Sequence, residues 1–356
     1  MTNWSARWGS SMAEPRVAVG GPDDVAEQPS NCRDAWSLAL EAAAARDDRV
    51  VVLVNDSIGS AGLEGFSRRF PERVIDVGIA EQNMVSVAAG LATTGRTVFV
   101  SSAASFLTGR ALEQIKVDVA YTRANVKLIG QSPGVGYGPL GSTHHAIEDI
   151  SWMSALPAVP VVAPSNPAET ASAVAWAAGW AGCVYIRVPR RLYGTPSTSP
   201  ETFTFGRATV AREGPDITLV ATGAITGLVT EAAELLATEG IDARVLLMST
   251  IKPLDPGPLL DAALGRAGIV TVEDGLVTGL GASVAAFLSE HLPTPMRRIG
   301  FHDAFAGTGD DHTLLERAGI SVAGIAAAAR SLMARPLPPT PCTSACGFRV
   351  AEVQGG

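Results

Sequence analysis

Residues 74–95, VIDVGIAEQNMVSVAAGLATTG, predict a short strand, a glycine and then a helix. After Gly78, apolar residues recur at helical spacing, at Ile79, Met84, Val87, Ala88 and Leu91. One carboxylate, Glu81, falls in the first turn of this helix. A carboxylate between an apolar strand and an apolar helix must be neutral, ion-paired or hydrogen-bonded, because an unpaired charge away from water is costly. Glu81 is therefore either an acid that caps its own helix or part of a site.

The composition excludes several classes of protein. The chain of 356 residues has 47% hydrophobic and 17% charged residues, which is typical of an α/β protein with buried strands and closely packed helices. Its net charge of −8 gives no electrostatic support for a nucleic-acid partner. No apolar run reaches the roughly 18 residues of a membrane span. The N-terminal residues lack the apolar segment of a secretory signal, so we expect a soluble cytoplasmic protein.

Three segments of the chain lack apolar periodicity. Residues 1–30 predict a flexible N-terminal arm, residues 193–215 an interdomain linker, and residues 336–356 a flexible tail. The tail holds Cys342 and Cys346 at a C-x3-C spacing without a second pair of ligands, so we do not expect a zinc site there. The four cysteines are too few for a disulfide framework in a chain of this length.

Between these segments, apolar strands alternate with helices, which predicts an α/β protein with two doubly wound parallel-sheet domains, residues 31–192 and 216–335. Continuous apolar runs indicate strands that are buried on both faces. In the first domain we expect strands at 50–54, 74–77, 97–100, 126–129, 159–163 and 184–188, and helices at 31–46, 79–93, 105–123 and 167–179. In the second domain we expect strands at 217–221, 243–248, 268–272 and 296–299, and helices at 225–238, 256–266, 282–291 and 322–333.

Four features of the first domain directly follow predicted strands: Asp56, Glu81, Phe106 and the loop 131–145. Ligands of open parallel sheets bind beyond the carboxyl ends of the strands, so we expect these features to lie together. The chain has no G-x-G-x-x-G after its first strand, no G-x-x-x-x-G-K-[ST] and no cluster of metal-ligand residues. The sequence therefore predicts a site without a phosphate cradle or a metal centre of its own.

Four motifs resemble the C-terminal half of transketolases: GIAEQNM (78–84), FLTGRALEQIKVDVA (106–120), GSTHHAIEDISWMSALP (141–157) and STIKPLD (249–255). The resemblance covers residues 32–333 and points most closely to split transketolases, whose C-terminal half is a separate subunit. It implies a pyrimidine-binding domain followed by the transketolase C-terminal domain. The diphosphate-binding domain, with its G-D-G…N magnesium motif, is then expected on a partner subunit, because the nearest string, Glu273-Asp274-Gly275, lies in the wrong domain.

The resemblance also implies thiamine diphosphate as cofactor, with Mg²⁺ held mainly by the partner in an α2β2 heterotetramer. In this family a glutamate hydrogen-bonds N1′ of the aminopyrimidine and favours the imino form that removes the C2 proton. Glu81 matches that glutamate, and Phe106 matches the ring that stacks on the pyrimidine, although its position alone suits a core residue. Asp56 and Ile79 match cofactor-lining positions, whereas position alone makes Asp56 a turn residue.

The same comparison implies residues that bind substrate. His144 matches the histidine of a T-H-[QH] motif that contacts substrate oxygens, and His145 is a weaker candidate because neighbours on an extended segment face opposite ways. Arg190 matches an arginine on the substrate phosphate, which a guanidinium fork suits. The alternatives are a histidine that only pins the loop and a surface arginine at a strand end.

Two positions depart from the family pattern. Leu140 stands where sugar-phosphate transketolases carry an aspartate before the glycine of G-x-T-H, and Gln131 stands where they carry a histidine. Both family residues contact hydroxyls of the donor sugar, so Gln131 remains a candidate for substrate binding while the usual xylulose 5-phosphate donor becomes doubtful. We expect a specialised substrate.

The implied reaction is transfer of a two-carbon ketol unit from an α-ketol donor to an aldehyde. Two other enzymes share the two-domain layout and the glutamate: the beta subunit of a 2-oxo acid dehydrogenase and deoxyxylulose phosphate synthase. The segment GSTHHAIED (141–149) favours transketolase over both. A non-catalytic scaffold subunit would be expected to lose Glu81, Phe106 and His144 together, and all three are present.

Overall fold

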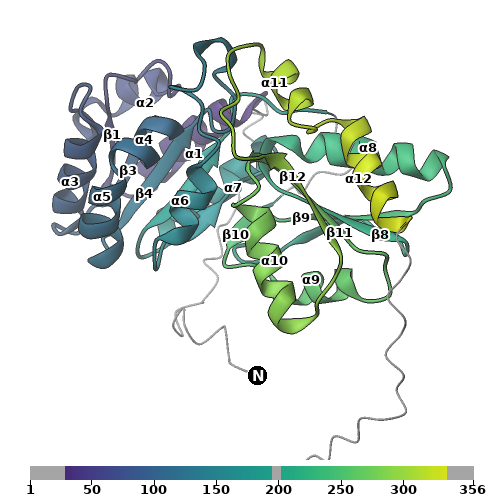
Figure 1. Cartoon of the computed structure of the whole chain (residues 1–356). Helices are drawn as coiled ribbons and strands as arrows, with labels where there is room; N and C mark the ends of the chain where they lie inside the picture. The colour runs from purple at the N-terminus through teal and green to yellow at the C-terminus, as the bar shows by residue number, and fades with distance from the viewer. Residues whose placement is uncertain (1–28, 195–201, 335–356) are drawn as a thin grey trace, which may run out of the picture.

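The computed structural model describes residues 29–194 and 202–334 (Figure 1). Residues 1–28 of the predicted arm, residues 195–201 of the predicted linker and the predicted tail with Cys342 and Cys346 lie outside the described residues. Within the described part of the chain, no helix is long and apolar enough to cross a membrane.

The first sheet has seven strands in the order β10-β5-β6-β4-β3-β1-β2. Six are parallel, and the short edge strand β10 pairs antiparallel with β5. The order makes β1 to β4 neighbours, so their carboxyl ends meet at one edge of the sheet. The strands are β1 (Val50–Val54), β2 (Val74–Asp76), β3 (Thr97–Ala103), β4 (Val126–Gln131), β5 (Val161–Val162), β6 (Val184–Val188) and β10 (Thr250–Lys252).

Helices cover both faces of this sheet, as the continuous apolar strands predict (Figure 1). Along β1, Val52 packs with the α1 and α7 side chains, while Leu53 packs on the opposite face with Met84 and Leu107. The helical segments are α1 (Cys32–Arg46), α2 (Glu64–Arg69), η2 (Pro71–Arg73), α3 (Glu81–Ala92), α4 (Ala104–Arg110), α5 (Leu112–Gln114), η3 (Ile115–Tyr121), η4 (Gly138–Leu140), α6 (Asp149–Ala155) and α7 (Pro167–Gly179).

The second sheet has five strands in the order β12-β11-β8-β9-β7 and is parallel except for β7, which pairs antiparallel with β9 at one edge. Its strands are β7 (Thr209–Arg212), β8 (Ile217–Ala221), β9 (Ala243–Leu247), β11 (Ile269–Leu276) and β12 (Met296–Phe301). Its helical segments are η5 (Gly223–Ile225), α8 (Thr226–Thr238), α9 (Pro256–Ala263), α10 (Leu280–His291), α11 (Asp311–Arg317) and α12 (Val322–Met333). The predicted class, two doubly wound α/β domains, is confirmed, with one antiparallel edge strand in each sheet.

The two sheets share more than a linker. Strand β10 lies in the second half of the chain but extends the first sheet, where Lys252 donates from Nζ to the carbonyl of Ser154 at 2.9 Å and to that of Leu156. One apolar cluster contains buried residues of both sheets, including Leu128 and Val220. The domains are therefore held together by a continuous core and by β10, whose backbone and lysine bind the first domain.

Several predicted elements differ from the structure. The single helix expected at 105–123 is broken into α4, α5 and a π-helix, η3. A side chain at Gly109 would come within 3.2 Å of the Trp152 ring, and a glycine inside a helix weakens it. Residues 209–212 of the expected linker form β7, an edge strand with two exposed residues and no apolar alternation. The short elements α2, α6, α11 and β10 were also missed, because so few residues show no periodicity.

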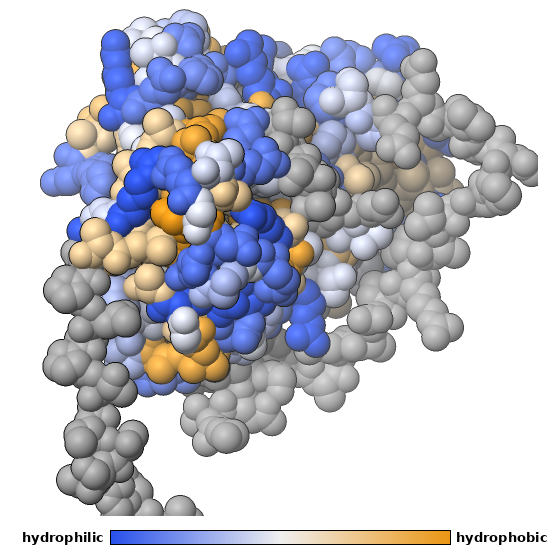
Figure 2. Space-filling view, turned by 90° about the vertical axis from the view of Figure 1, so that its right-hand side faces the viewer, coloured by the Kyte–Doolittle hydropathy of each residue, from blue (hydrophilic) through white to orange (hydrophobic). Residues whose placement is uncertain are grey.

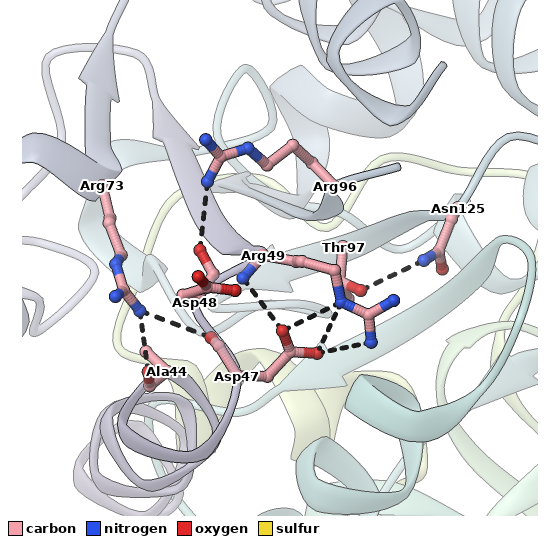
Figure 3. A network of polar contacts seen from close by, with 8 residues as sticks. All are labelled: Ala44, Asp47, Asp48, Arg49, Arg73, Arg96, Thr97 and Asn125. Atoms are coloured by element: carbon pink, nitrogen blue, oxygen red, sulfur yellow. Dashed lines mark hydrogen bonds and ion pairs between the residues drawn. The ribbon is translucent and has the colours of Figure 1, made fainter. Parts of the chain in front are cut away.

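The amino ends of the strands form the edge opposite the candidate site. There Arg49 donates from Nε and Nη2 to the carboxylate of Asp47, and Arg96 donates to the carbonyl of Asp48 at 3.0 Å (Figure 3). Arg73 binds the carbonyl of Ala44 at 2.7 Å and so ties the end of α1 to this edge. These arginines are already occupied by acceptors of the chain.

The outer side of the second domain is mostly hydrophilic. Figure 2 shows that, where grey atoms do not cover it, polar side chains divide the apolar ones into separate patches. Scattered apolar residues are normal on a solvated face. The residues from which a binding site could be built are found instead at the carboxyl edge of the first sheet.

Candidate functional site

The carboxyl edge of the first sheet brings together residues that are far apart in the sequence. Asn55 follows β1, Glu81 begins α3 after β2, and Phe106 lies in α4 directly after β3. The loop 131–145 leaves the end of β4 in the middle of the same edge. The strand order therefore places these residues close together, as the sequence predicts.

Glu81 is buried at this edge, with 4% of its surface exposed. Its Oε1 accepts a hydrogen bond from Asn55 Nδ2 at 2.9 Å and another from Arg110 Nη1 at 2.9 Å, which is also an ion pair. The helix it begins has Ala80 at its N-cap, without a side-chain capping bond. The described contacts of Glu81 therefore lead away from its own helix, so capping does not explain it.

A row of rings and guanidinium groups continues from Glu81. The Arg110 guanidinium lies over the Phe106 ring, 3.9 Å from its centroid. The His144 ring meets Phe106 edge-on at 5.1 Å and Tyr137 at 5.9 Å between centroids. Arg190 lies 5.9 Å from the centroid of Tyr137. The row leads from the buried carboxylate to an exposed arginine and spans α4, the loop 131–145 and the end of β6.

A solvent-open pocket of about 360 Å³ lies beside Glu81. Its lining consists of Ile79, Ala80, Glu81, Gln82, Asn83 and Arg110. A carboxylate oxygen can bind a ring N–H, and the partly exposed Phe106 ring, over which the Arg110 guanidinium lies, has an apolar face on which a flat group can stack. This combination fits a flat nitrogen heterocycle such as an aminopyrimidine.

The structure separates the two histidines. His145 is buried, its Nε2 lies 3.0 Å from the carbonyl oxygen of Gly138, and burial lowers the pKa of its imidazole. His144 is partly exposed, with Nδ1 3.0 Å from the Thr143 hydroxyl. His145 therefore pins the loop, and His144 is the histidine that faces the row of rings.

Of the remaining predicted residues, two have exposed side chains that a ligand could reach, and two make hydrogen bonds within the fold. Ile79 is 76% exposed at the pocket, and Arg190 is exposed. Gln131 is buried and donates from Nε2 to the Ser101 hydroxyl at 3.2 Å, so its amide serves the sheet edge. Asp56 is exposed with a φ of 58°, and its backbone N–H binds Asp76 Oδ1 at 2.9 Å. These are the properties of a turn residue, the alternative given for Asp56.

Sequence reasoning missed the two donors to Glu81. Asn55 follows the first strand directly, so its place at a carboxyl edge was a usable signal. Arg110 lies within the motif that contains Phe106, one helical turn further on. Both contacts span more than 25 residues, which no local pattern reports.

A second group of charges lies sealed between the domains, and we call it the interdomain cluster: Asp149, Tyr185, Arg187, Glu273 and Asp274. Arg187 on β6 donates from Nε to Asp149 at 2.8 Å and from Nη1 to Asp274 on β11 at 2.5 Å. The Tyr185 hydroxyl donates to Asp149 at 2.6 Å. All five residues are buried.

The interdomain cluster shows strong electrostatic effects. Burial alone would lower the pKa of Arg187, but Asp149 and Asp274 raise it overall, so the guanidinium stays charged. Burial raises the pKa of Glu273 to about 7, against the opposing effect of hydrogen bonds from the backbone of Gly281 and Leu280. The string Glu273-Asp274 thus holds α10 and Arg187 in place, as part of the core.

The loop 131–145 lies against the interdomain cluster and the second domain. A Cβ atom at Gly134 would lie 2.5 Å from Asp274 Oδ2, and one at Gly141 would lie 2.7 Å from Thr308 Oγ1. The loop that carries His144 therefore packs directly against the second domain. Leu140, at the departure from the family pattern, is 54% exposed beside this contact.

These observations define a two-domain α/β protein with a candidate site at the carboxyl edge of its first sheet. Two family models match it: the transketolase pyrimidine-binding domain over residues 28–196 and the transketolase C-terminal domain over residues 206–325. The chain belongs to the transketolase family. Its domain content is that of the C-terminal subunit of a split transketolase, which confirms the resemblance.

Individual relatives agree with this assignment. The chain is 38% identical to the "6-deoxy-6-sulfo-D-fructose transketolase subunit SqwH" of Clostridium sp. (strain MSTE9), over 85% of this chain and 94% of the relative. It is 37% identical to an apulose-4-phosphate transketolase subunit of Phocaeicola vulgatus, over 83% of this chain and 95% of that relative. A solved structure titled "Split gene transketolase, inactive beta4 tetramer" superposes with a TM-score of 0.77 at 37% identity, covering 85% of this chain and 98% of that one.

Proposed function

We propose that this chain, with a partner subunit, transfers a two-carbon ketol unit from an α-ketol donor to an aldehyde and depends on thiamine diphosphate. The observation that carries the proposal is Glu81, a buried carboxylate that lines an open pocket together with Arg110, whose guanidinium lies over the Phe106 ring. Thiamine diphosphate supplies the nucleophilic carbon that takes up the ketol unit. Glu81 would hydrogen-bond the pyrimidine ring nitrogen, Phe106 would stack on the ring, and Ile79 would line the pocket beside it.

The proposal includes a second polypeptide because this chain supplies one half of the cofactor site. Within the ranges that the structure describes, no group of three His, Cys, Asp or Glu side chains is placed to hold a metal ion. We assign the diphosphate and Mg²⁺ to a partner with a diphosphate-binding domain, in an α2β2 heterotetramer in the cytoplasm. The interdomain cluster, which contains Glu273 and Asp274, is a structural element in this scheme.

The donor is proposed to be a ketose that ends in an anionic group. The two curated relatives are named for a sulfonated and a phosphorylated ketose. Arg190 is exposed at the far end of the row that begins at Glu81, where its guanidinium fork suits a phosphate or sulfonate. His144, between the two ends, would hydrogen-bond substrate oxygens. The exposed, apolar Leu140 offers no hydrogen bond to a donor hydroxyl, which favours a specialised substrate.

The first test replaces Glu81 in the complex reconstituted with its partner. Glu81→Gln keeps the size of the side chain, and we expect turnover to fall by about 100-fold or more while assembly, measured by size-exclusion chromatography, persists. Glu64→Gln is the matched control, because Glu64 is also the first residue of a helix but is exposed. Near-normal turnover in Glu81→Gln would contradict the assignment, and a wild-type complex that never binds thiamine diphosphate would favour a scaffold.

A second test concerns the donor. Ketoses that end in phosphate, sulfonate or a plain hydroxyl are compared with one aldehyde acceptor. Arg190→Ala should raise KM for the anionic donors by about tenfold or more and leave the hydroxyl-ended donor nearly unchanged. Equal effects on all donors would contradict the role of Arg190. Decarboxylation of pyruvate by the wild-type complex would point instead to the dehydrogenase or deoxyxylulose-type alternative.

A further inference from the structure

Arg110 makes both of the contacts that the proposed function assigns to the pyrimidine of the cofactor. Its Nη1 donates to Glu81 Oε1 at 2.9 Å, and its guanidinium lies 3.9 Å from the centroid of the Phe106 ring. It also lines the pocket beside Glu81. At 3.9 Å two flat groups are in van der Waals contact, so this face of the Phe106 ring is covered.

A guanidinium and an aminopyrimidine are alike in the features that this site can detect. Both are flat and delocalised, both carry N–H donors in the plane, and both stack on an aromatic face. One carboxylate oxygen and one ring face cannot hold both groups in the same place. We propose that Arg110 occupies the position of the aminopyrimidine in the free subunit and competes with the cofactor for Glu81 and Phe106. This inference rests on the proposed function.

The structure also explains why such an occupant would be useful. The Glu81 side chain is only 5% exposed, and a buried carboxylate without a cationic or protonated partner is costly. Arg110 compensates this charge, together with Asn55, while no heterocycle is bound. Without Arg110, the free site would hold a carboxylate with a single neutral donor.

The contacts of Arg110 with Glu81 and Phe106 are weak enough for a ligand to displace them. The Arg110 side chain is 52% exposed, and Arg110 is the last residue of α4, so the guanidinium can turn outward into water without moving the helix. Ion pairs and cation–π contacts with an exposed partner contribute little to stability. The competition should therefore lower the affinity for the cofactor by a modest factor, about five- to tenfold, in proportion to the fraction of sites that Arg110 leaves open.

The experiment measures binding of thiamine diphosphate, with Mg²⁺ and without substrate, to the complex reconstituted from this chain and the diphosphate-binding subunit. Calorimetry gives the dissociation constant for wild type, Arg110→Ala and Arg110→Gln, which keeps more of the side chain. We expect both variants to bind about five- to tenfold more tightly than wild type. Arg49→Ala, which removes an exposed, ion-paired arginine at the opposite edge of the sheet, should leave the constant unchanged.

A double-variant cycle separates competition from a general structural effect. In a Glu81→Ala background Arg110 has lost its acceptor and keeps only the contact with Phe106, so Arg110→Ala should tighten binding less than it does in wild type. Unchanged or weaker binding by Arg110→Ala, beside normal binding by wild type, would overturn this inference and leave the proposed function intact. If neither wild type nor Arg110→Ala binds thiamine diphosphate, the proposed function fails, and this inference fails with it.

Discussion

The Glu81–Arg110 pair and the interdomain cluster use the same two kinds of charged group in opposite surroundings. The nitrogen–oxygen distance is 2.9 Å between Arg110 and Glu81 and 2.8 Å between Arg187 and Asp149. The Arg110 side chain, however, is 52% exposed, whereas that of Arg187 is 2% exposed. Bond length therefore does not distinguish the two sites. Burial decides which pair can open during function and which fixes the fold.

The difference follows from the cost of removing charge from water. An exposed pair exchanges its partner for water at little cost, which suits a site where a ligand enters. Breaking a buried pair leaves an uncompensated charge in the core, so such a pair stays closed. Arg187 joins β6 and α6 of the first domain to β11 of the second, and the loop that carries His144 packs on this junction. A fixed cluster thus holds the loop beside an exchangeable pair.

The largest effect is expected from Arg187→Met. Removing the guanidinium leaves Asp149 and Asp274 buried without their cation, and we expect the free energy of unfolding to fall by about 3–5 kcal/mol, measured by urea denaturation. Arg110→Ala is the comparison and should cost less, about 1–2 kcal/mol, because it leaves the buried Glu81 with Asn55 as donor but beside an open pocket that water can enter. Adding Asp149→Asn and Asp274→Asn to Arg187→Met should recover part of the loss. Similar small losses in Arg187→Met and Arg110→Ala would break the comparison.

Much of the open site could be predicted from sequence. Strand ends of a parallel sheet meet at one edge, so the order of Glu81, Phe106 and the loop 131–145 along the chain was enough to place them together. The pairing of Glu81 followed from its apolar neighbours, but the identity of the partners did not. Arg110 and Asn55 are 29 and 26 residues away, and a contact of that range depends on how strands and helices pack.

The interdomain cluster was not predicted, for a related physical reason. Its bonds from Arg187 span 38 and 87 residues and join two domains that the sequence presents as separate. Strand β10 has three residues, too few for a pattern, and its place in the first sheet depends on an edge that β5 leaves open. Sequence periodicity thus predicts the long elements within each domain, whereas the junction arises from packing between domains.

Gly134 and Gly78 allow the comparison to be tested at the backbone. Both have positive φ, 62° and 70°, but a Cβ at Gly134 would lie 2.7 Å from the Asp274 carbonyl oxygen, and one at Gly78 would meet nothing within 4 Å. Gly78→Ala should cost about 1 kcal/mol for its conformation alone, and Gly134→Ala about 3 kcal/mol because the loop must also move. Urea denaturation of both variants checks the difference. Equal losses would mean that the junction tolerates displacement.

The pH dependence of stability should report the sealed cluster. Glu273 has a pKa of about 7 in the folded chain, raised by burial from 4.5. Between these values the folded chain keeps a proton that the unfolded chain has released, so raising the pH favours unfolding. From pH 5 to pH 7 the folded chain should lose about 2 kcal/mol of stability through this group.

Glu273→Gln removes that ionisation and provides the control. Its stability should fall less than that of wild type between pH 5 and pH 7, when both are measured by urea denaturation. Identical pH profiles for wild type and Glu273→Gln would show that the buried carboxylate does not titrate in this range.

The smallest effect on stability is expected from Arg49→Ala, because the Arg49 side chain is more exposed than those of the other two ion-paired arginines, Arg110 and Arg187. Arg49 holds Asp47 with three side-chain hydrogen bonds of 2.8–3.2 Å, a geometry as good as that of Arg187, yet its side chain is 65% exposed (Figure 3). If burial rather than geometry decides the contribution of a pair, this variant should leave the urea midpoint unchanged within error. A midpoint shift comparable to that of Arg187→Met would show that bond geometry controls stability, and the contrast between the open and the sealed arginines would then need another cause.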